Sequence, residues 1–165
     1  MTQMNSYLRF QTPKAIAQPP RDARIANPAG PRELVMIVDD DDSVALLAES
    51  VLTAGGYRVI TARDGFRAVD IFKKLREEIQ LVILDFVMPI MDGADVLNEL
   101  LRIDPHVRVV LTSGFECPTK LNGMLAVGLC GFIPKPLGQK KLLLSVRSTL
   151  DAIRSEDAIA SSARR

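Results

Sequence analysis

The stretch LVMIVDDDDSV, residues 34–44, limits the possible folds more than any other feature, because four aspartates directly follow five apolar residues. A short run that is apolar on both faces is typical of a strand covered by helices on either side of a parallel sheet. Four carboxylates gathered at one point repel one another, so their position calls for an explanation. Ligands of an open α/β sheet bind at the carboxyl ends of its strands, and we expect some of these aspartates to serve such a site.

From Leu34 onward, short apolar runs alternate with amphipathic segments, which is the pattern of repeated βα units around a parallel sheet. The strands are expected at residues 34–38, 57–61, 81–84, 107–111 and 131–133. The helices are expected at about 43–54, 93–103, 119–127 and 139–154, and a further one begins after Asp64-Gly65 with an apolar face that reaches Leu75. The predicted fold class is therefore α/β, with a doubly wound sheet of five parallel strands.

The chain has 165 residues, of which 47% are hydrophobic and 25% charged, a size and balance that fit one globular domain. Residues 1–31 contain five prolines and scattered arginines with little periodicity, so we expect a flexible tail there. The folded domain is expected over residues 32–154. Residues 155–165 are expected to form a polar C-terminal tail.

Composition argues against several classes of function. The formal net charge of +1, without a long basic run, disfavours direct DNA binding. The two cysteines, Cys117 and Cys130, form no CxxC pair, and His106 is the only histidine, so zinc and disulfide sites are not indicated. No stretch reaches the roughly 18 apolar residues of a membrane span, and the N-terminus lacks the apolar core of a signal peptide. We expect a cytoplasmic protein with no membrane contact.

Chemically useful side chains follow four of the five expected strands. Asp39 and Asp40 end the first strand, Asp85 ends the third, Thr112 ends the fourth, and Lys135 follows the fifth. Because the carboxyl ends of parallel strands open on the same edge of a sheet, we expect these residues to converge in one shallow cleft.

Three carboxylates in contact would either raise the pKa of one of them strongly or recruit a cation. All the available ligands are oxygen atoms, which favours Mg²⁺, with Mn²⁺ as a substitute. Asp41 and Asp42 stand where the following helix needs an N-terminal cap and favours negative charge, so we expect them to serve the helix.

Asp85 closes the apolar run LVILD and precedes a loop that contains Pro89 and Gly93. A carboxylate beside a divalent cation and a lysine can attack a phosphoryl donor, because the two cations neutralise charge on the transferring oxygens. The product would be an aspartyl phosphate. Thr112 could then donate its hydroxyl to a phosphoryl oxygen and link the covalent state to the position of its loop.

Together, the segments IVDDDD, LVILDFVMPIMDG, VVLTSG and GFIPKPL resemble the receiver domain of two-component response regulators, in the same order and at domain-like spacing. The resemblance runs from Leu34 to about Arg154. It implies a flavodoxin-like (βα)5 three-layer sandwich with the strand order 2-1-3-4-5. It also implies that Asp85 accepts a phosphoryl group from a histidine kinase or a histidine phosphotransfer protein.

The resemblance further implies a set of site residues. Asp40, Asp85 and the carbonyl of Val87 would ligate Mg²⁺ directly, and Asp39 would act through water. Lys135 would contact the phosphoryl group, and the bond between Lys135 and Pro136 would be cis.

In the family, a threonine or serine and an aromatic residue move together on activation, and these correspond to Thr112 and Phe132. Phe132 lacks the phenolic hydroxyl of a tyrosine, so only burial of its ring could report the switch. Val87, two positions after Asp85, is apolar, whereas many receivers have a polar residue there. Gly114, two positions after Thr112, has no side chain. As a hypothesis, both features change how the attacking water is held, and therefore the lifetime of the phosphoryl state.

The expected protein is a signalling switch that only catalyses its own phosphorylation and dephosphorylation. Its output would be contact with a downstream protein, or homodimerisation, through the fourth helix, fifth strand and fifth helix. It would be either a stand-alone regulator or the receiver part of a hybrid kinase.

Three other classes of protein share features with this sequence. A haloacid dehalogenase-like phosphohydrolase also uses an aspartate nucleophile with Mg²⁺, but it needs a second aspartate two positions later, where this chain has Val87. A Rossmann nucleotide-binding domain would have a glycine-rich turn after the first strand. The third alternative is an interaction module that binds partners without phosphorylation, but this chain has every active-site residue that a phosphorylated receiver is expected to have.

Overall fold

The computed structural model describes residues 23–27, 29–114 and 129–162. Within these residues, six strands form one sheet in the order β1-β3-β2-β4-β5-β6. The strands are β1 (Ile25–Ala26), β2 (Leu34–Val38), β3 (Arg58–Ala62), β4 (Ile79–Asp85), β5 (Val109–Ser113) and β6 (Leu129–Pro134). The helices are α1 (Asp42–Ala54), α2 (Gly65–Leu75), α3 (Gly93–Ile103) and α5 (Gln139–Ser162).

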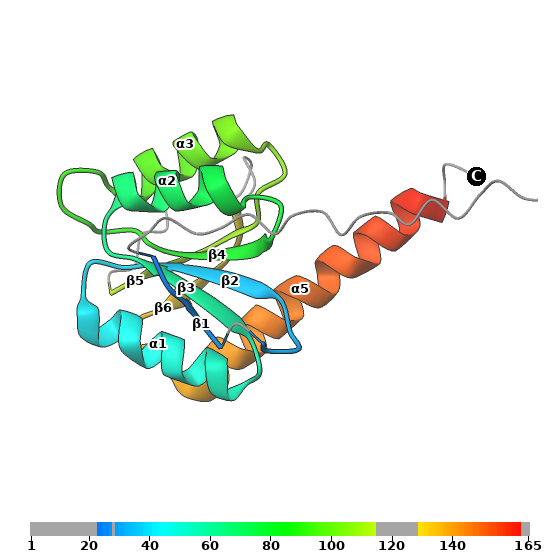
Figure 1. The fold of residues 1–165 in the computed structure, drawn as a ribbon, viewed down its shortest axis with the longest axis horizontal. Coiled ribbons are helices and arrows are strands. Elements are labelled where there is room, and N and C mark those ends of the chain that lie inside the picture. The colour runs from blue at the N-terminus through cyan, green and yellow to red at the C-terminus, as the bar shows by residue number, and fades with distance from the viewer. Residues whose placement is uncertain (1–22, 28, 115–128, 163–165) are drawn as a thin grey trace, which may run out of the picture.

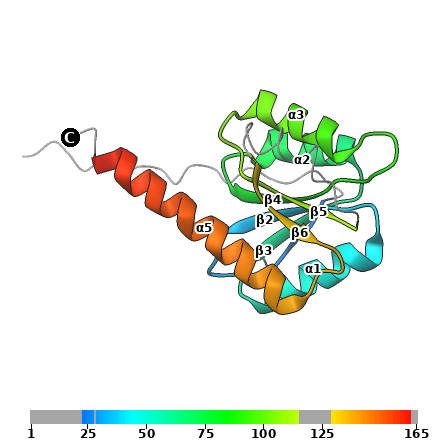
Figure 2. The same ribbon diagram turned by 180° about the vertical axis from the view of Figure 1, so that it is seen from behind.

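The five strands from β2 to β6 are all parallel. Their order in the sheet is the predicted order 2-1-3-4-5, and the α/β fold class is confirmed. The helices form two layers: α2 and α3 cover one face, and α1 and α5 cover the other (Figure 1; Figure 2 gives the view from behind).

Strand β2 shows how the sequence produces this sandwich, since all five of its residues are buried. Met36 and Val38 belong to the core cluster beneath α2 and α3. Val35 and Ile37 belong to the cluster beneath α1 and α5. Alternate side chains of a strand point to opposite faces, so a continuous apolar run supplies both cores at once.

Three helices begin at aspartate caps. Asp41 caps α1, and its Oδ1 accepts hydrogen bonds from the backbone N–H groups of Ser43 (2.8 Å) and Val44 (3.3 Å). Asp64 caps α2 and Asp92 caps α3 in the same way. Each carboxylate satisfies backbone donors that have no partner within the helix. The capping role expected for Asp41 is therefore confirmed.

The N-terminal part of the chain differs from the expectation of a tail over residues 1–31. Ile25 and Ala26 pair antiparallel with Ile60 and Val59 and so add β1 to the outer edge of β3. The side-chain amide of Asn27 then donates to the carbonyl of Tyr57 over 3.1 Å. Ala26 is buried in the core beneath α1 and α5, and Ile25 packs against the core beneath α2 and α3, so each residue of this short strand contacts one of the two cores.

The C-terminal part also differs from expectation. The last helix was expected to end at about residue 154, but α5 continues through the first part of the polar segment to Ser162. Residues 139–162 contain neither glycine nor proline, so no residue stops the helix. The helix extends well away from the sheet (Figure 1). The helix expected at 119–127 lies outside the described residues.

Strand β5 is shifted by two residues from the prediction of 107–111. The turn that precedes it extends to Val107, whose backbone N–H donates to the carbonyl of Asp104 over 3.1 Å.

In the described part of the chain, no helix combines the length and the apolar character that crossing a membrane requires.

Candidate functional site

Three aspartates meet at the carboxyl edge of the sheet. The parallel pairing of β2 with β4 sets Val38 beside Leu84, so the residues that follow them, Asp39 and Asp85, emerge side by side. Asp40 joins them, and one carboxylate oxygen from each residue lies within 4.8 Å of the others. Asp39 is 2% exposed and Asp85 is 5% exposed, whereas Asp40 faces solvent.

Lys135 reaches into this cluster from the loop after β6. Its Nζ lies 2.8 Å from Oδ2 of Asp39 and 2.9 Å from Oδ2 of Asp85. The backbone places this side chain, because the N–H of Lys135 donates to the carbonyl of Ser113 over 2.9 Å. The bond between Lys135 and Pro136 is cis, as expected. One ammonium group therefore bridges two buried carboxylates.

The electrostatics of this cluster leave negative charge unbalanced. Burial raises the pKa of Asp39, and this effect outweighs the lowering by hydrogen bonds from Lys135 and from the N–H of Asp41. Burial alone would lower the pKa of Lys135, but its hydrogen bonds with Asp39 and Asp85 reverse the direction and raise that pKa. The lysine thus stays charged, and three carboxylates face one ammonium group. This set of hard oxygen donors fits a small divalent cation such as Mg²⁺.

Thr112 lies beside Asp85 in the sheet. The two residues are register partners in neighbouring parallel strands, and the N–H of Phe86 donates to the carbonyl of Thr112 over 2.8 Å. Thr112 is 1% exposed. Phe132, on β6, is half-buried and packs against the core beneath α2 and α3. The predicted switch residues therefore lie on successive strands: Thr112 is on β5, which neighbours β4, and Phe132 is on β6, which is one strand further out.

The loop after β4 closes around Asp85. The N–H of Val87 points at Oδ1 of Asp85 over 3.4 Å, and the side chain of Val87 is exposed. A Cβ on Gly93 would lie 2.5 Å from the carbonyl oxygen of Asp85, so only glycine permits this close approach. Ile90, in the same loop, has a φ of 69° and is 94% exposed.

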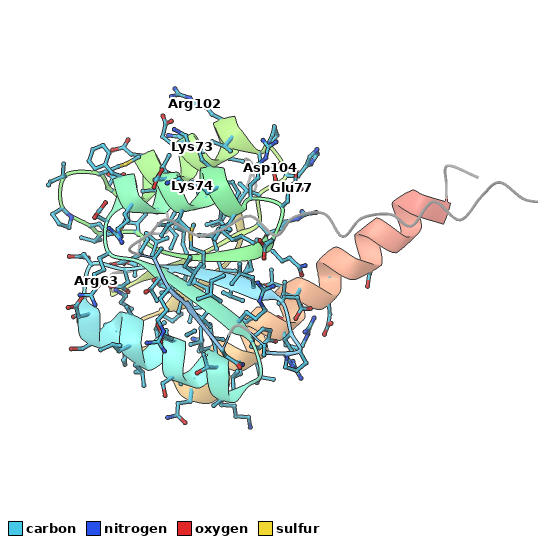
Figure 3. All side chains as sticks on the ribbon, in the orientation of Figure 1. Arg63, Lys73, Lys74, Glu77, Arg102 and Asp104 are labelled. Carbon is cyan, nitrogen blue, oxygen red and sulfur yellow. The ribbon has the colours of Figure 1, made fainter. Side chains whose placement is uncertain are left out.

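Two contacts near the site were not foreseen from the sequence. Arg63, in the loop after β3, forms an ion pair with Asp42 in the first turn of α1. Figure 3 labels Arg63 near the start of α1. The second is the contact of Gly93 with the backbone of Asp85. Neither has a local sequence signal, because both depend on how two loops approach each other.

Comparison with known proteins agrees with this geometry. The family profile described as the response regulator receiver domain matches residues 35–147. The fold, the strand-end aspartates and this match lead to one conclusion: the chain belongs to the response regulator receiver domain family. Members of this family act as signalling switches in two-component systems and bind Mg²⁺ in an acidic pocket.

Among characterised relatives, the chain is 35% identical over 124 residues to the chemotaxis protein CheY of Treponema pallidum, covering 74% of this chain and 86% of CheY. It is 33% identical over 117 residues to the sensor kinase CckA of Brucella abortus, covering 71% of this chain but only 12% of the kinase. The match to the probable transcriptional regulator ycf27 of Porphyridium aerugineum (36% over 119 residues) spans 72% of this chain and 48% of the regulator. The chain thus matches only part of the two longer relatives.

Solved structures show the same fold. The CheX-CheY-BeF3-Mg+2 complex from Borrelia burgdorferi superposes with a TM-score of 0.69 at 32% identity, covering 74% of this chain and 97% of that one. A CheY-like receiver domain protein from Methanospirillum hungatei superposes with a TM-score of 0.70 at 22% identity. The superposition covers 75% of this chain and 98% of that protein's chain.

Proposed function

We propose that this protein is a phosphorylation-activated switch in which Asp85 accepts a phosphoryl group from a histidine kinase or a histidine phosphotransfer protein. The observation that carries the proposal is the pair of contacts from Lys135 Nζ to Asp39 and Asp85, inside a cluster of three aspartates. Asp85 ends β4, which lies between β2 and β5 in the sheet, so it has the other two aspartates on one side and Thr112 on the other.

In the proposed step, a carboxylate oxygen of Asp85 attacks the phosphorus atom of a phosphohistidine. The new O–P bond forms as the N–P bond breaks, and the imidazole leaves with the electron pair and takes up a proton. Lys135 offsets charge on the phosphoryl oxygens, since its ammonium group already lies 2.9 Å from the acceptor carboxylate. The buried position of Asp85 keeps the reacting atoms away from bulk water.

The reaction is proposed to depend on Mg²⁺, with Mn²⁺ as a substitute. Asp40, Asp85 and the carbonyl of Val87 would hold the ion directly, and Asp39 would act through water. When bound, the ion supplies positive charge beside the transferring oxygens. Asp39 and Asp85 form the buried side of this cluster, and Asp40 forms its exposed side, which faces solvent.

The switch itself is proposed to involve Thr112 and Phe132. The hydroxyl of Thr112 would bond to the phosphoryl group, and the ring of Phe132 would become more buried. A phosphoryl group adds up to about two negative charges to this small cleft. Output would follow by contact of a cytoplasmic partner, or a second copy, with β6, α5 and the segment 119–127, without direct DNA binding. That segment lies outside the described residues.

Phosphorylation by a small donor tests the proposal. Wild type is incubated with acetyl phosphate and Mg²⁺, and the intact mass is measured. We expect one added phosphoryl group in wild type, none in Asp85→Asn, and a normal gain in Asp70→Asn, which changes an exposed aspartate of α2. Modification of Asp85→Asn to the same extent as wild type would show that another residue is the acceptor.

A further inference from the structure

An open groove lies at the surface between α2 and α3, and we call it the α2–α3 groove. It has a volume of about 380 Å³. Its lining residues are Phe66, Val69, Asp70 and Lys73 of α2, Met91 of the loop before α3, and Glu99 of α3. The four residues of α2 follow the spacing of one helix face, so the groove runs along about two turns of that helix, a length of about 10 Å.

One end of the groove is apolar. Phe66 is 65% exposed and lies outside both core clusters of the described residues. Met91 packs against the core beneath α2 and α3, and its neighbour in the chain, Ile90, is 94% exposed. Burying such side chains against another apolar group is favourable, and exposed apolar groups that lie together mark an interaction site.

The carboxylates of the groove already have partners. Asp70 forms an ion pair with Lys74 over 2.9 Å, and Glu99 forms one with Arg102. Figure 3 labels Lys74 on α2 and Arg102 on α3. Because both pairs are exposed and each lies within a single helix, an occupant gains little from charge. Contacts with the apolar side chains therefore decide what binds.

The chain enters the described domain beside this groove. Because Ile25 pairs with Ile60 in antiparallel register, the residues before Ile25 lie toward the end of β3 that leads into α2 (Figure 1). Ala23 packs against the core beneath α2 and α3, and with Arg67 it lines a hollow at the start of α2. Arg67 directly follows Phe66, so the segment before Ala23 joins the domain next to the apolar end of the groove.

That segment carries apolar side chains of its own. Residues 1–22 lie outside the described residues, but their sequence contains the run YLRF, with Tyr7, Leu8 and Phe10. Aromatic residues make up 5% of the chain, yet two of the four residues of this run are aromatic. Twelve residues separate Phe10 from Ala23, and they can span up to about 40 Å, well beyond the length of the groove.

Attachment to the same chain favours a contact between this run and the groove. A tether of this length holds the run at an effective concentration in the millimolar range. A contact with a Kd of about 0.1 mM would then leave the groove about 90% occupied. The same contact between separate molecules at micromolar concentration would be rare. A few apolar contacts are therefore enough to keep the run in place.

From these observations we propose that the run Tyr7–Phe10 docks in the α2–α3 groove of its own chain, with the ring of Phe10 against Phe66 and Met91. The N-terminal segment thus serves as a built-in ligand, and another protein reaches the groove only by displacing it. This docking is separate from the phosphorylation proposed at Asp85 and does not depend on it.

A single fluorescent reporter can test the docking, because the chain contains no tryptophan. The full-length Phe10→Trp variant is compared with a synthetic peptide of residues 1–22 that carries the same substitution. We expect emission at a shorter wavelength than in the peptide. We also expect an acrylamide quenching constant at least about twofold lower, because a ring that is docked about 90% of the time is shielded from the quencher. Emission and quenching equal to those of the peptide would overturn the proposal.

Further substitutions in the Phe10→Trp background locate the contact. Phe66→Ser should return both signals to those of the peptide, because it removes the exposed ring of the groove. Leu46→Ser is the matched control, since it changes a residue of α1 that is 59% exposed and outside the groove, and it should leave both signals unchanged. Leu8→Ser tests the contact from the side of the segment and should also release the reporter. Thermal melting checks that each variant keeps the fold.

Three results would count against the docking. Leu46→Ser could change the signals as much as Phe66→Ser does, which would make the contact nonspecific. Phe66→Ser and Leu8→Ser could both leave the reporter shielded, which would place it elsewhere. Shielding that increases with protein concentration would place the run on a second copy of the chain, whereas docking within one chain predicts signals that do not change with concentration.

Discussion

Gly93 shows how one residue without a side chain positions the acceptor. Its backbone N–H donates to the carbonyl of Phe86 over 3.0 Å, and a Cβ at this position would lie 2.5 Å from the carbonyl oxygen of Asp85. The start of α3 can therefore close directly over the end of β4. Any side chain at this position would press on backbone atoms, which cannot move aside as a flexible side chain can.

We predict that Gly93→Ala destabilises the protein by about 1–3 kcal/mol, the usual cost of overpacking, and slows phosphorylation of Asp85. The reason is that the new Cβ would lie 2.5 Å from the backbone carbonyl oxygen of Asp85 and 2.8 Å from the Cα of Phe86. Urea denaturation and the acetyl phosphate assay measure the two effects. Gly138→Ala is the control, since its Cβ would meet only Lys141 at 4.0 Å. Equal stability of the two variants would contradict this account.

The sequence predicts which charged residues meet at the sheet edge, but it does not predict how the loops surround them. Asp39, Asp85 and Lys135 follow strands, and the rule that parallel strands end on one edge brings them together. The approach of Gly93 to Asp85 and the ion pair of Arg63 with Asp42 depend on loop paths. No periodicity in the sequence encodes those paths, because they depend on how separate loops pack together.

Among the helices, α5 is joined to the sheet by a charged anchor at the edge opposite the aspartates. The Nη2 atom of Arg147 lies 3.2 Å from Oε1 of Glu33, which directly precedes β2. The same atom lies 2.7 Å from Oδ1 of Asp151 in the next turn of the helix. The side chain of Glu33 is only 4% exposed. Burial alone would lower the pKa of Arg147, but hydrogen bonds with Asp151 and Glu33 raise it. The guanidinium group of Arg147 therefore stays charged over the whole physiological range.

We predict that Arg147→Met lowers the free energy of unfolding by about 3 kcal/mol, because it removes the cation that faces a buried carboxylate. The matched control, Asp151→Asn, changes a partner whose side chain is 59% exposed and should cost less than about 1 kcal/mol. Chemical denaturation of both variants gives the comparison. Similar small losses in both would mean that the anchor contributes little to stability.

At the level of elements, the sequence predicts the five parallel strands and most helix starts, because apolar runs and aspartate caps are local signals. It does not predict β1, since two apolar residues in a proline-rich segment form a strand only when the edge of β3 is there to receive them. It also misses the end of α5. The polar residues after 154 show no core-facing pattern, yet none of them stops a helix.

For the molecule as a whole, the strand order determines where the chemistry occurs. Because β4 lies between β2 and β5, Asp85 has the aspartates of one neighbour on one side and Thr112 on the other. Lys135 enters from β6 beyond them. No single segment of the sequence contains this site, and it exists only once the sheet has formed.

The central claim is that this edge of the sheet turns Asp85 into a magnesium-dependent phosphoryl acceptor. The most direct test is the rate of phosphorylation at Asp85 by acetyl phosphate as Mg²⁺ is titrated, in wild type and in Asp40→Asn. We predict a saturable dependence on Mg²⁺ in wild type and a loss of at least about tenfold in the rate or in apparent Mg²⁺ affinity in the variant. A rate that does not change with Mg²⁺, or that is the same in both proteins, would contradict the account.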